Sequence, residues 1–199
     1  MSFPNFDRYF NQSNSSQGLD AYDDTFRVVD RTDPSKSVIF QVGNLTTNTQ
    51  RTLTLPDYDL NPGKRNVLAS SGNTTMTAAM SGSIMLLDTA TVDYTLPAIS
   101  ASDIGMYFDF FATIASTNQS IVAQAGDLLT GSIQIINVAA TGDDTFAPDV
   151  TDDLTISMNG TTTGGLGVGA RIRVTAITAD RWFVEGILSG SGTVLTPFS

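Results

Sequence analysis

Apolar and polar residues alternate through most of the second half of the chain, and this alternation predicts β-strands. The clearest case is a pair of segments, 171–177 and 182–187, that keep the two-residue period of a strand with one buried face. The four residues between them form a turn, so the two segments predict a hairpin. The residues expected to point inward are Ile172, Val174 and Ala176 in the first segment and Trp182, Val184 and Gly186 in the second.

Similar runs, separated by turn residues, recur from residue 83 to the C-terminus and indicate one β-sandwich domain over 83–199. No segment keeps a helical period of 3.6 residues for more than about two turns. A set of about eight strands is typical of a two-sheet sandwich or a jelly roll. We therefore expect an all-β fold whose larger domain is a jelly-roll-like antiparallel β-sandwich. Its strands are expected at 83–87, 92–97, 106–111, 119–123, 132–138, 154–158, 170–177 and 182–188.

The front of the chain predicts a smaller β unit over residues 25–62. Three short strands are expected there, at 26–30, 37–42 and 51–55, and Pro56 ends the last one. Three strands bury a thin core, so this unit is expected to lean on another surface. A stretch rich in Ser, Gly, Thr and Asn then predicts a linker over residues 63–82.

Residues 1–24 are interpreted as an N-terminal arm. Phe3, Phe6 and Phe10 precede a polar tract, 11–18, that cannot bury enough apolar surface to offset its ordering entropy. Burial of each phenylalanine side chain in a pocket would contribute about 1.5–3 kcal/mol of favourable free energy. The arm is either an anchor that orders on a partner or a frayed terminus.

Composition excludes several classes of chemistry. The chain has no His and no Cys, which excludes Ser-His-Asp and Cys-His catalysis, disulfides, and zinc or haem sites built on those residues. Glu185 is the only glutamate, and Lys36 and Lys64 are the only lysines, which disfavours a helical protein. No cofactor is expected. No apolar window of membrane-spanning length and no secretory signal is found, so no membrane contact is expected.

Charge is distributed unevenly along the chain. Residues 1–66 hold seven basic and eight acidic residues, whereas residues 67–199 hold three basic and twelve acidic ones. A net charge of −10 disfavours nucleic-acid binding, which needs clustered Lys and Arg. The nearly neutral front is interpreted as a surface that lies against a partner and the acidic remainder as facing solvent. Chance, together with the preference of β loops for Asp, explains the same asymmetry.

The acidic residues suggest two chemistries, each with a simpler alternative. The loop 143–153 carries five aspartates, which resembles the oxygen-rich surroundings of Ca²⁺, but it lacks the spacing of a known calcium loop. Asp93, Asp103 and Asp109 lie in or near strands, where a glycosidase would need two carboxylates. Asp109, between two phenylalanines, is the acid whose pKa we expect to be most perturbed. A solvated loop and a carboxylate paired with Arg or a backbone amide are the respective alternatives.

Two further features are assigned to structure. The glycine run 164–169 precedes a strand and contains no Lys, so it predicts a flexible turn rather than a phosphate-binding loop. Trp182 offers a ring for stacking on a sugar, but the alternation places it in the core.

Two stretches resemble virion proteins of tailed bacteriophages. The segment 30–57 is similar to one common in phage fibres and other exposed virion subunits. Most of the remaining chain resembles phage head decoration (cement) proteins. It does so through Thr95-Leu96-Pro97, the aromatic strand 105–111, the turn 159–165, the Trp-Phe-Val-Glu-Gly strand 182–186 and the Thr-Pro-Phe end 196–198. This resemblance implies a β-sandwich subunit, often a homotrimer, on the outer surface of the capsid, and it implies no catalytic residues.

The sequence therefore predicts a structural, non-enzymatic protein that binds the major capsid protein and bridges neighbouring subunits. The rival hypotheses are a tail fibre or other appendage that binds a host-surface glycan, and a glycan-cleaving enzyme. For the fibre, the expected site is the loops and exposed aromatic residues at one end of the sandwich. For the capsid protein, the candidate anchoring residues are Phe3, Phe6, Arg8, Phe10, Arg27, Arg31, Phe40 and Arg51.

Overall fold

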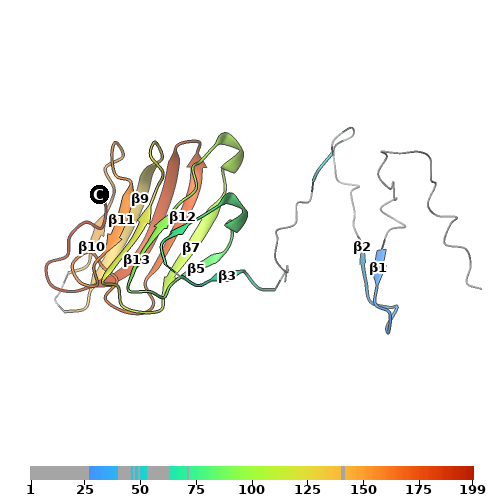
Figure 1. Ribbon diagram of the computed structural model, residues 1–199, viewed down its shortest axis with the longest axis horizontal. Coiled ribbons are helices and arrows are strands. Elements are labelled where there is room, and N and C mark those ends of the chain that lie inside the picture. The colour runs from blue at the N-terminus through green and yellow to red at the C-terminus, as the bar shows by residue number, and fades with distance from the viewer. Residues whose placement is uncertain are drawn as a thin grey trace, which may run out of the picture. The chain divides into compact units, whose positions relative to one another are not determined.

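The chain forms an all-β protein with two compact units, residues 1–55 and residues 56–199. A computed structural model describes residues 27–39, 46, 48, 50–52, 63–70, 72–139 and 142–199 (Figure 1). In this described part, no helix reaches the length and apolarity that crossing a bilayer requires.

The described part of the first unit is a β-hairpin. β1 (Arg27–Val29) and β2 (Ser37–Ile39) pair antiparallel, with Val28 opposite Val38. Asp30 shapes the connection, because its carboxylate accepts hydrogen bonds from the backbone N–H groups of Thr32 and Asp33 at 2.7 and 3.0 Å. The strands expected at 26–30 and 37–42 are thus present over residues 27–29 and 37–39, and residues 26 and 40–42 lie outside the described residues. The third expected strand, 51–55, lies largely outside the described residues.

The second unit is a sandwich of a seven-stranded and a four-stranded sheet. The order in the larger sheet is β10-β9-β13-β12-β7-β5-β3 (Figure 1). The order in the smaller sheet is β11-β8-β6-β4. The larger sheet consists of β3 (Val67–Leu68), β5 (Ile84–Leu87), β7 (Tyr107–Ala112), β9 (Leu128–Asn137), β10 (Asp144–Phe146), β12 (Arg171–Thr178) and β13 (Arg181–Gly190). The smaller sheet consists of β4 (Thr74–Thr75), β6 (Thr91–Thr95), β8 (Asn118–Val122) and β11 (Thr155–Met158). Two short 3-10 turns, η2 (Ala78–Met80) and η3 (Ala101–Asp103), lie in the connections.

The pairing within the sheets is mixed, which corrects the expectation of an antiparallel sandwich. From β3 to β8 the chain alternates between the two sheets, strand by strand. A chain that crosses to the opposite sheet and returns re-enters the first sheet in its original direction. The pairs β3–β5, β5–β7, β4–β6 and β6–β8 are accordingly parallel, as is β9–β13. This winding differs from the antiparallel hairpins and Greek keys of a jelly roll.

The segment 63–82, expected as a linker, belongs to the sandwich instead. Val67 and Leu68 pair with β5, and Thr74 and Thr75 pair with β6, so each sheet gains an edge strand. The polar composition that suggested a linker is compatible with edge strands, since an edge strand has one neighbour and stays partly exposed. The sandwich domain therefore begins before the expected residue 83.

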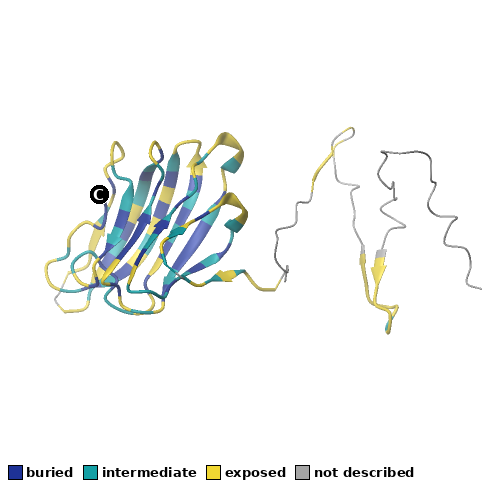
Figure 2. Cartoon of the chain, viewed as in Figure 1, coloured by how far each residue is buried: buried dark blue, intermediate teal, exposed yellow. Residues whose placement is uncertain are grey.

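The core lies between the two sheets and follows the alternation read from the sequence. Figure 2 shows buried positions alternating with intermediate and exposed ones along the strands of the sandwich. Phe108, Phe110 and Trp182 are fully buried, and the rings of Phe110 and Tyr94 pack edge to face with their centroids 5.4 Å apart. The predicted hairpin is confirmed: β12 and β13 pair antiparallel with Ile172 opposite Gly186. The predicted core position of Trp182 is confirmed as well.

Candidate functional site

The outer face of the seven-stranded sheet carries most of the charged residues that the sandwich places on strands, together with Tyr107, Phe111 and Phe183. Because successive side chains of a strand point to opposite faces, the residues between the core positions project outward here. Strand pairing aligns them in rows across the sheet. One row contains Ile84, Asp109, Arg173, Glu185 and Ser132, and the next contains Leu86, Phe111, Arg171, Ile187, Gln134 and Thr145.

Asp109 is the centre of an arginine cluster on this face. Its carboxylate is 1% exposed and accepts two hydrogen bonds from Arg173, Nε to Oδ1 and Nη2 to Oδ2, both at 2.7 Å. Arg65 donates a further hydrogen bond from Nη1 to Oδ2. Arg65 also binds the carbonyl oxygens of Gly82 and Ser83, so it ties the chain before β3 to the turn before β5. These contacts join four separate segments of the domain: the chain before β3, the turn before β5, β7 and β12.

The pKa of Asp109 lies below its ordinary value. Burial raises this pKa, but the hydrogen bonds from Arg173 and Arg65 and their positive charges outweigh burial. Hydrogen bonding to Asp109 in turn raises the pKa of Arg173. A carboxylate that stays ionised and is held on both oxygens is poorly suited to act as a general acid. The pairing of Asp109 with arginine is the simpler of the two alternatives that the sequence left open.

This lowered pKa predicts a pH dependence of stability that Asp109→Asn removes. Asp109 binds a proton more readily in the unfolded chain than in the folded one. The contribution of ionised Asp109 to the free energy of unfolding is therefore complete above the ordinary pKa of 3.8, and it is lost as the pH falls through the lower pKa of the folded protein. We expect the stability gap between the natural chain and Asp109→Asn to narrow as the pH falls below 3.8, measured by urea denaturation from pH 7 to 2. Other carboxylates titrate equally in both proteins and cancel. A gap that stays constant with pH contradicts this interpretation.

Arg171 is the third arginine of the cluster and is the least engaged by Asp109. Its Nη2 lies 3.9 Å from Oδ1, too far for a hydrogen bond, and its side chain is half exposed. The guanidinium lies 6.0 Å from the ring centroid of Phe111. Arg65 and Arg173 lie at similar distances, 5.4 and 5.3 Å, from the ring of Tyr107. The hydrogen-bond donors of Arg171 are therefore available to a ligand.

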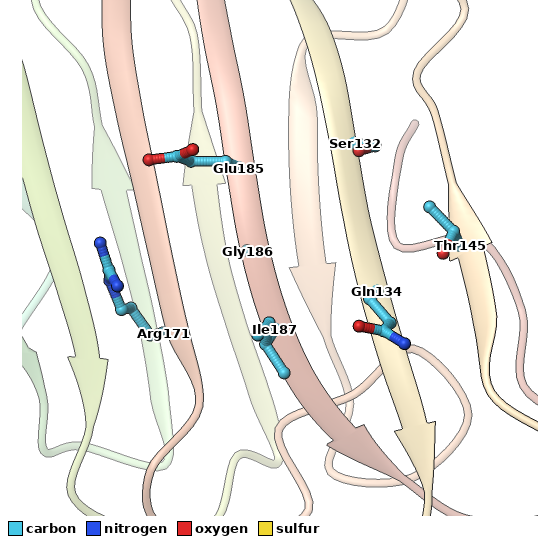
Figure 3. Close-up of a pocket in the computed structure, with 7 residues that line it drawn as sticks. All are labelled: Ser132, Gln134, Thr145, Arg171, Glu185, Gly186 and Ile187. Carbon is cyan, nitrogen blue, oxygen red and sulfur yellow. The ribbon is translucent and has the colours of Figure 1, made fainter.

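A groove of about 390 Å³ opens beside Arg171, across β12, β13, β9 and β10 (Figure 3). This volume lies within the range of small-molecule sites. Its lining combines two opposite charges, three neutral polar side chains and a short apolar strip. The lining residues are Ser132, Gln134, Thr145, Arg171, Glu185, Gly186 and Ile187.

The anchoring residues expected from the sequence are not brought together by the described structure. Arg31 and Arg51 are exposed, and Arg27 lies in β1. Phe3, Phe6, Arg8, Phe10 and Phe40 lie outside the described residues, as does the whole arm 1–24. Their role as anchors therefore stays a prediction.

The acidic loop 143–153 uses several of its carboxylates locally. Asp149 accepts hydrogen bonds from Thr151, and Asp153 accepts one from the backbone N–H of Asp149 at 2.6 Å. Asp143 accepts one from the backbone N–H of Asn137. Within the described residues, no three acidic side chains gather closely enough to hold a metal ion.

Sequence reasoning missed the arginine cluster and the groove. The available signal was the pattern Arg171-x-Arg173, which places two cations on the outer face of a strand whose other face is apolar. The acidic partner of this pattern is Asp109, which lies between aromatic residues, but 64 residues separate it from Arg173 in the sequence. Arg65 lay in the supposed linker. The order of the strands in the sheet brings these partners together, and that order cannot be deduced from the local sequence patterns.

Comparison of the chain with models of protein families, with curated proteins and with solved structures finds no match in any of the three.

Proposed function

We propose that this chain is a structural virion protein that binds the outer surface of a bacteriophage capsid and stabilises it. In this proposal the first unit contacts the major capsid protein and the sandwich faces outward. The proposal rests on the resemblance of stretches that span most of residues 26–199 to virion subunits, and on one observation in particular. The small hairpin unit exposes an apolar cross-strand pair, Val28 and Val38, with exposed fractions of 58% and 60%.

An exposed apolar pair on a separate small unit supports a docking role. Two strands are marginally stable alone and gain stability when their apolar face packs against another surface. Arg31 and Arg51, both exposed, add positive charge for an acidic partner. The sandwich, by contrast, encloses its own core and carries most of the negative charge.

The mechanical role follows from where such a subunit would bind. A homotrimer that contacts several capsid subunits engages them together, and linked contacts strengthen one another without any new interaction. Interfaces of roughly 1,600 Å² are typical of stable complexes. Bridging of this kind would resist separation of neighbouring capsid subunits.

Removal of the proposed docking elements tests this function. We expect deletion of residues 1–24 to weaken binding to bare capsids at least about tenfold, and Val38→Asp to weaken it as well, because a buried unpaired charge is costly at an interface. Binding is measured by cosedimentation with capsids that lack the protein. The matched control is Val168→Asp, which places the same charge on an exposed valine of the sandwich.

Capsid binding that survives both changes, at unchanged sandwich stability, contradicts the proposal. The unfolding temperature of each variant separates loss of docking from loss of folding. In the deletion variant and in Val38→Asp the sandwich keeps its sequence, and in Val168→Asp the changed residue is exposed, so we expect that temperature to stay unchanged in all three.

The second candidate is a tail appendage that binds a host-surface glycan, and the groove on the seven-stranded sheet favours it. Labelling of intact particles distinguishes the two. A capsid subunit is found over the whole head, whereas an appendage is found only at the tail. The glycan-cleaving alternative is not proposed, because Asp109 is committed to Arg65 and Arg173.

A further inference from the structure

We propose that the groove across β12, β13, β9 and β10 binds a neutral sugar residue of a glycan. This goes beyond capsid binding and holds whether the chain belongs to the head or the tail. The site lies on the face of the sheet, whereas the sequence suggested the loops at one end of the sandwich. Figure 3 shows the groove's side chains on these four strands.

The charged side chains of the groove balance each other. Arg171 offers donors that Asp109 does not use, since Arg173 and Arg65 already occupy both carboxylate oxygens. Glu185, on the neighbouring strand, offers acceptors, and it is exposed. An anion would be attracted by Arg171 and repelled by Glu185, whereas a cation would be repelled by Arg171 and attracted by Glu185. A neutral ligand whose groups both donate and accept hydrogen bonds satisfies the two together.

Three neutral polar side chains extend this pattern on the other side of the groove. The Ser132 and Thr145 hydroxyls and the Gln134 amide make no hydrogen bond to any other residue that the structure describes. Each therefore has free donor and acceptor capacity facing the groove. A sugar ring carries several hydroxyls around its rim and matches such a set.

The floor of the groove provides an apolar contact. Ile187 is 53% exposed, and the backbone of Gly186 beside it also lines the groove. Phe183 lies two residues before Glu185 on the same face of β13 and is 39% exposed. Two strand residues span about 6.8 Å, so a neighbouring sugar residue can reach this ring. The C–H face of a pyranose packs on such apolar surfaces while its hydroxyls meet the polar wall.

Other ligand classes fit less well. A peptide added as a strand needs a sheet edge with unpaired backbone groups, whereas the groove lies over strands that are paired on both sides at β13 and β9. Nucleic acid is disfavoured by the domain's negative charge.

The test is a titration of the full ¹⁵N-labelled chain, followed by backbone amide shifts. The probes are D-glucose, D-galactose, D-mannose, N-acetyl-D-glucosamine and their short oligomers, with D-glucuronate and D-galacturonate as charged counterparts. We expect at least one neutral sugar to shift the amides of Gln134, Gly186 and Ile187, with a dissociation constant of about 1 mM for the monosaccharide. The uronates are expected to bind more weakly.

Variants connect the shifts to the groove. Glu185→Gln is expected to weaken binding about tenfold, because it removes a charged acceptor, and Gln134→Ala by a smaller factor. Asp152→Asn removes the same charge from an exposed loop residue and is expected to bind like the natural chain. Tighter binding of oligomers, lost in Phe183→Ala, indicates a polysaccharide as the natural source, and equal binding indicates a free sugar.

Several results would overturn the proposal. These are no shift with any of the neutral probes, shifts located away from the groove, unchanged binding by Glu185→Gln, or tighter binding of the uronates than of the neutral sugars. Capsid binding by the same variants is expected to stay unchanged, so failure here is distinct from failure of the proposed function.

Discussion

Asp109→Ala is expected to lower the free energy of unfolding of the sandwich by about 3 kcal/mol, the largest effect of any charge substitution in the domain. The substitution removes the shared acceptor of Arg65 and Arg173 and leaves their positive charges close together on one sheet face. Loss of one partner from a buried pair costs about 3–5 kcal/mol. The lower end applies because both arginines are about one third exposed and keep part of their hydration. Urea denaturation at pH 7 measures the change.

Two arginine variants provide the comparison. Arg65→Ala is expected to cost less than Asp109→Ala, because Asp109 keeps both hydrogen bonds from Arg173. Arg171→Ala is expected to cost less than about 1 kcal/mol, since its ion pair is long and half exposed. Equal losses for all three variants would contradict a cluster centred on one carboxylate.

The longer strands of the sandwich could be predicted because apolar residues alternate with outward-facing residues within each strand. Phe108 and Phe110 alternate with Tyr107, Asp109 and Phe111, and Ile172, Val174 and Ala176 alternate with Arg171, Arg173 and Thr175. A period of two marks both the strand and its buried face. The hairpin of β12 and β13 was predictable for the same reason, since only a short turn separates its strands.

Strand order could not be predicted in this way. A connection that turns back beside its own strand and one that crosses to the opposite sheet use similar turn residues. The parallel pairs from β3 to β8 are thus visible only once both sheets are in place. β3, β4 and β10 are two or three residues long, too short for a periodic signal, and they were missed.

The candidate site could not be predicted from the sequence for the same reason, because it depends on the order of the strands. The expected anchors were chosen by residue type in the first 51 residues, and of these only Arg27, Arg31 and Arg51 fall on described residues. The groove takes its side chains from four strands spread over residues 132–187, and no short window of sequence contains it. Asp109 was identified as unusual from its aromatic neighbours alone, but its partners became apparent from the register of β7 and β12.

Gly131→Ala is expected to disrupt the sandwich more than any other single methyl group added to it. Gly131 lies in β9 opposite Val184, with a φ of +108°. A Cβ placed there would lie 2.1 Å from the carbonyl oxygen of Val184 and 2.9 Å from its nitrogen, so the obstacle is backbone rather than a movable side chain. The β9–β13 pairing is a ten-residue parallel ladder inside the larger sheet, and separating it would break hydrogen bonds along its length.

The magnitude follows from two costs that add at this position. An alanine at positive φ costs about 1–2 kcal/mol, and overpacking a rigid site costs about 1–3 kcal/mol more, so we expect a loss of about 4 kcal/mol or failure to fold. Gly126→Ala is the matched control, because its φ is +100° and no atom lies within 4 Å of the added methyl group. Gly126→Ala is expected to show only the cost of an alanine at positive φ, about 1–2 kcal/mol, without the cost of overpacking. Thermal and urea unfolding of both variants gives the difference, and a Gly131→Ala protein as stable as Gly126→Ala would mean that β9 and β13 are not held as closely as the structure places them.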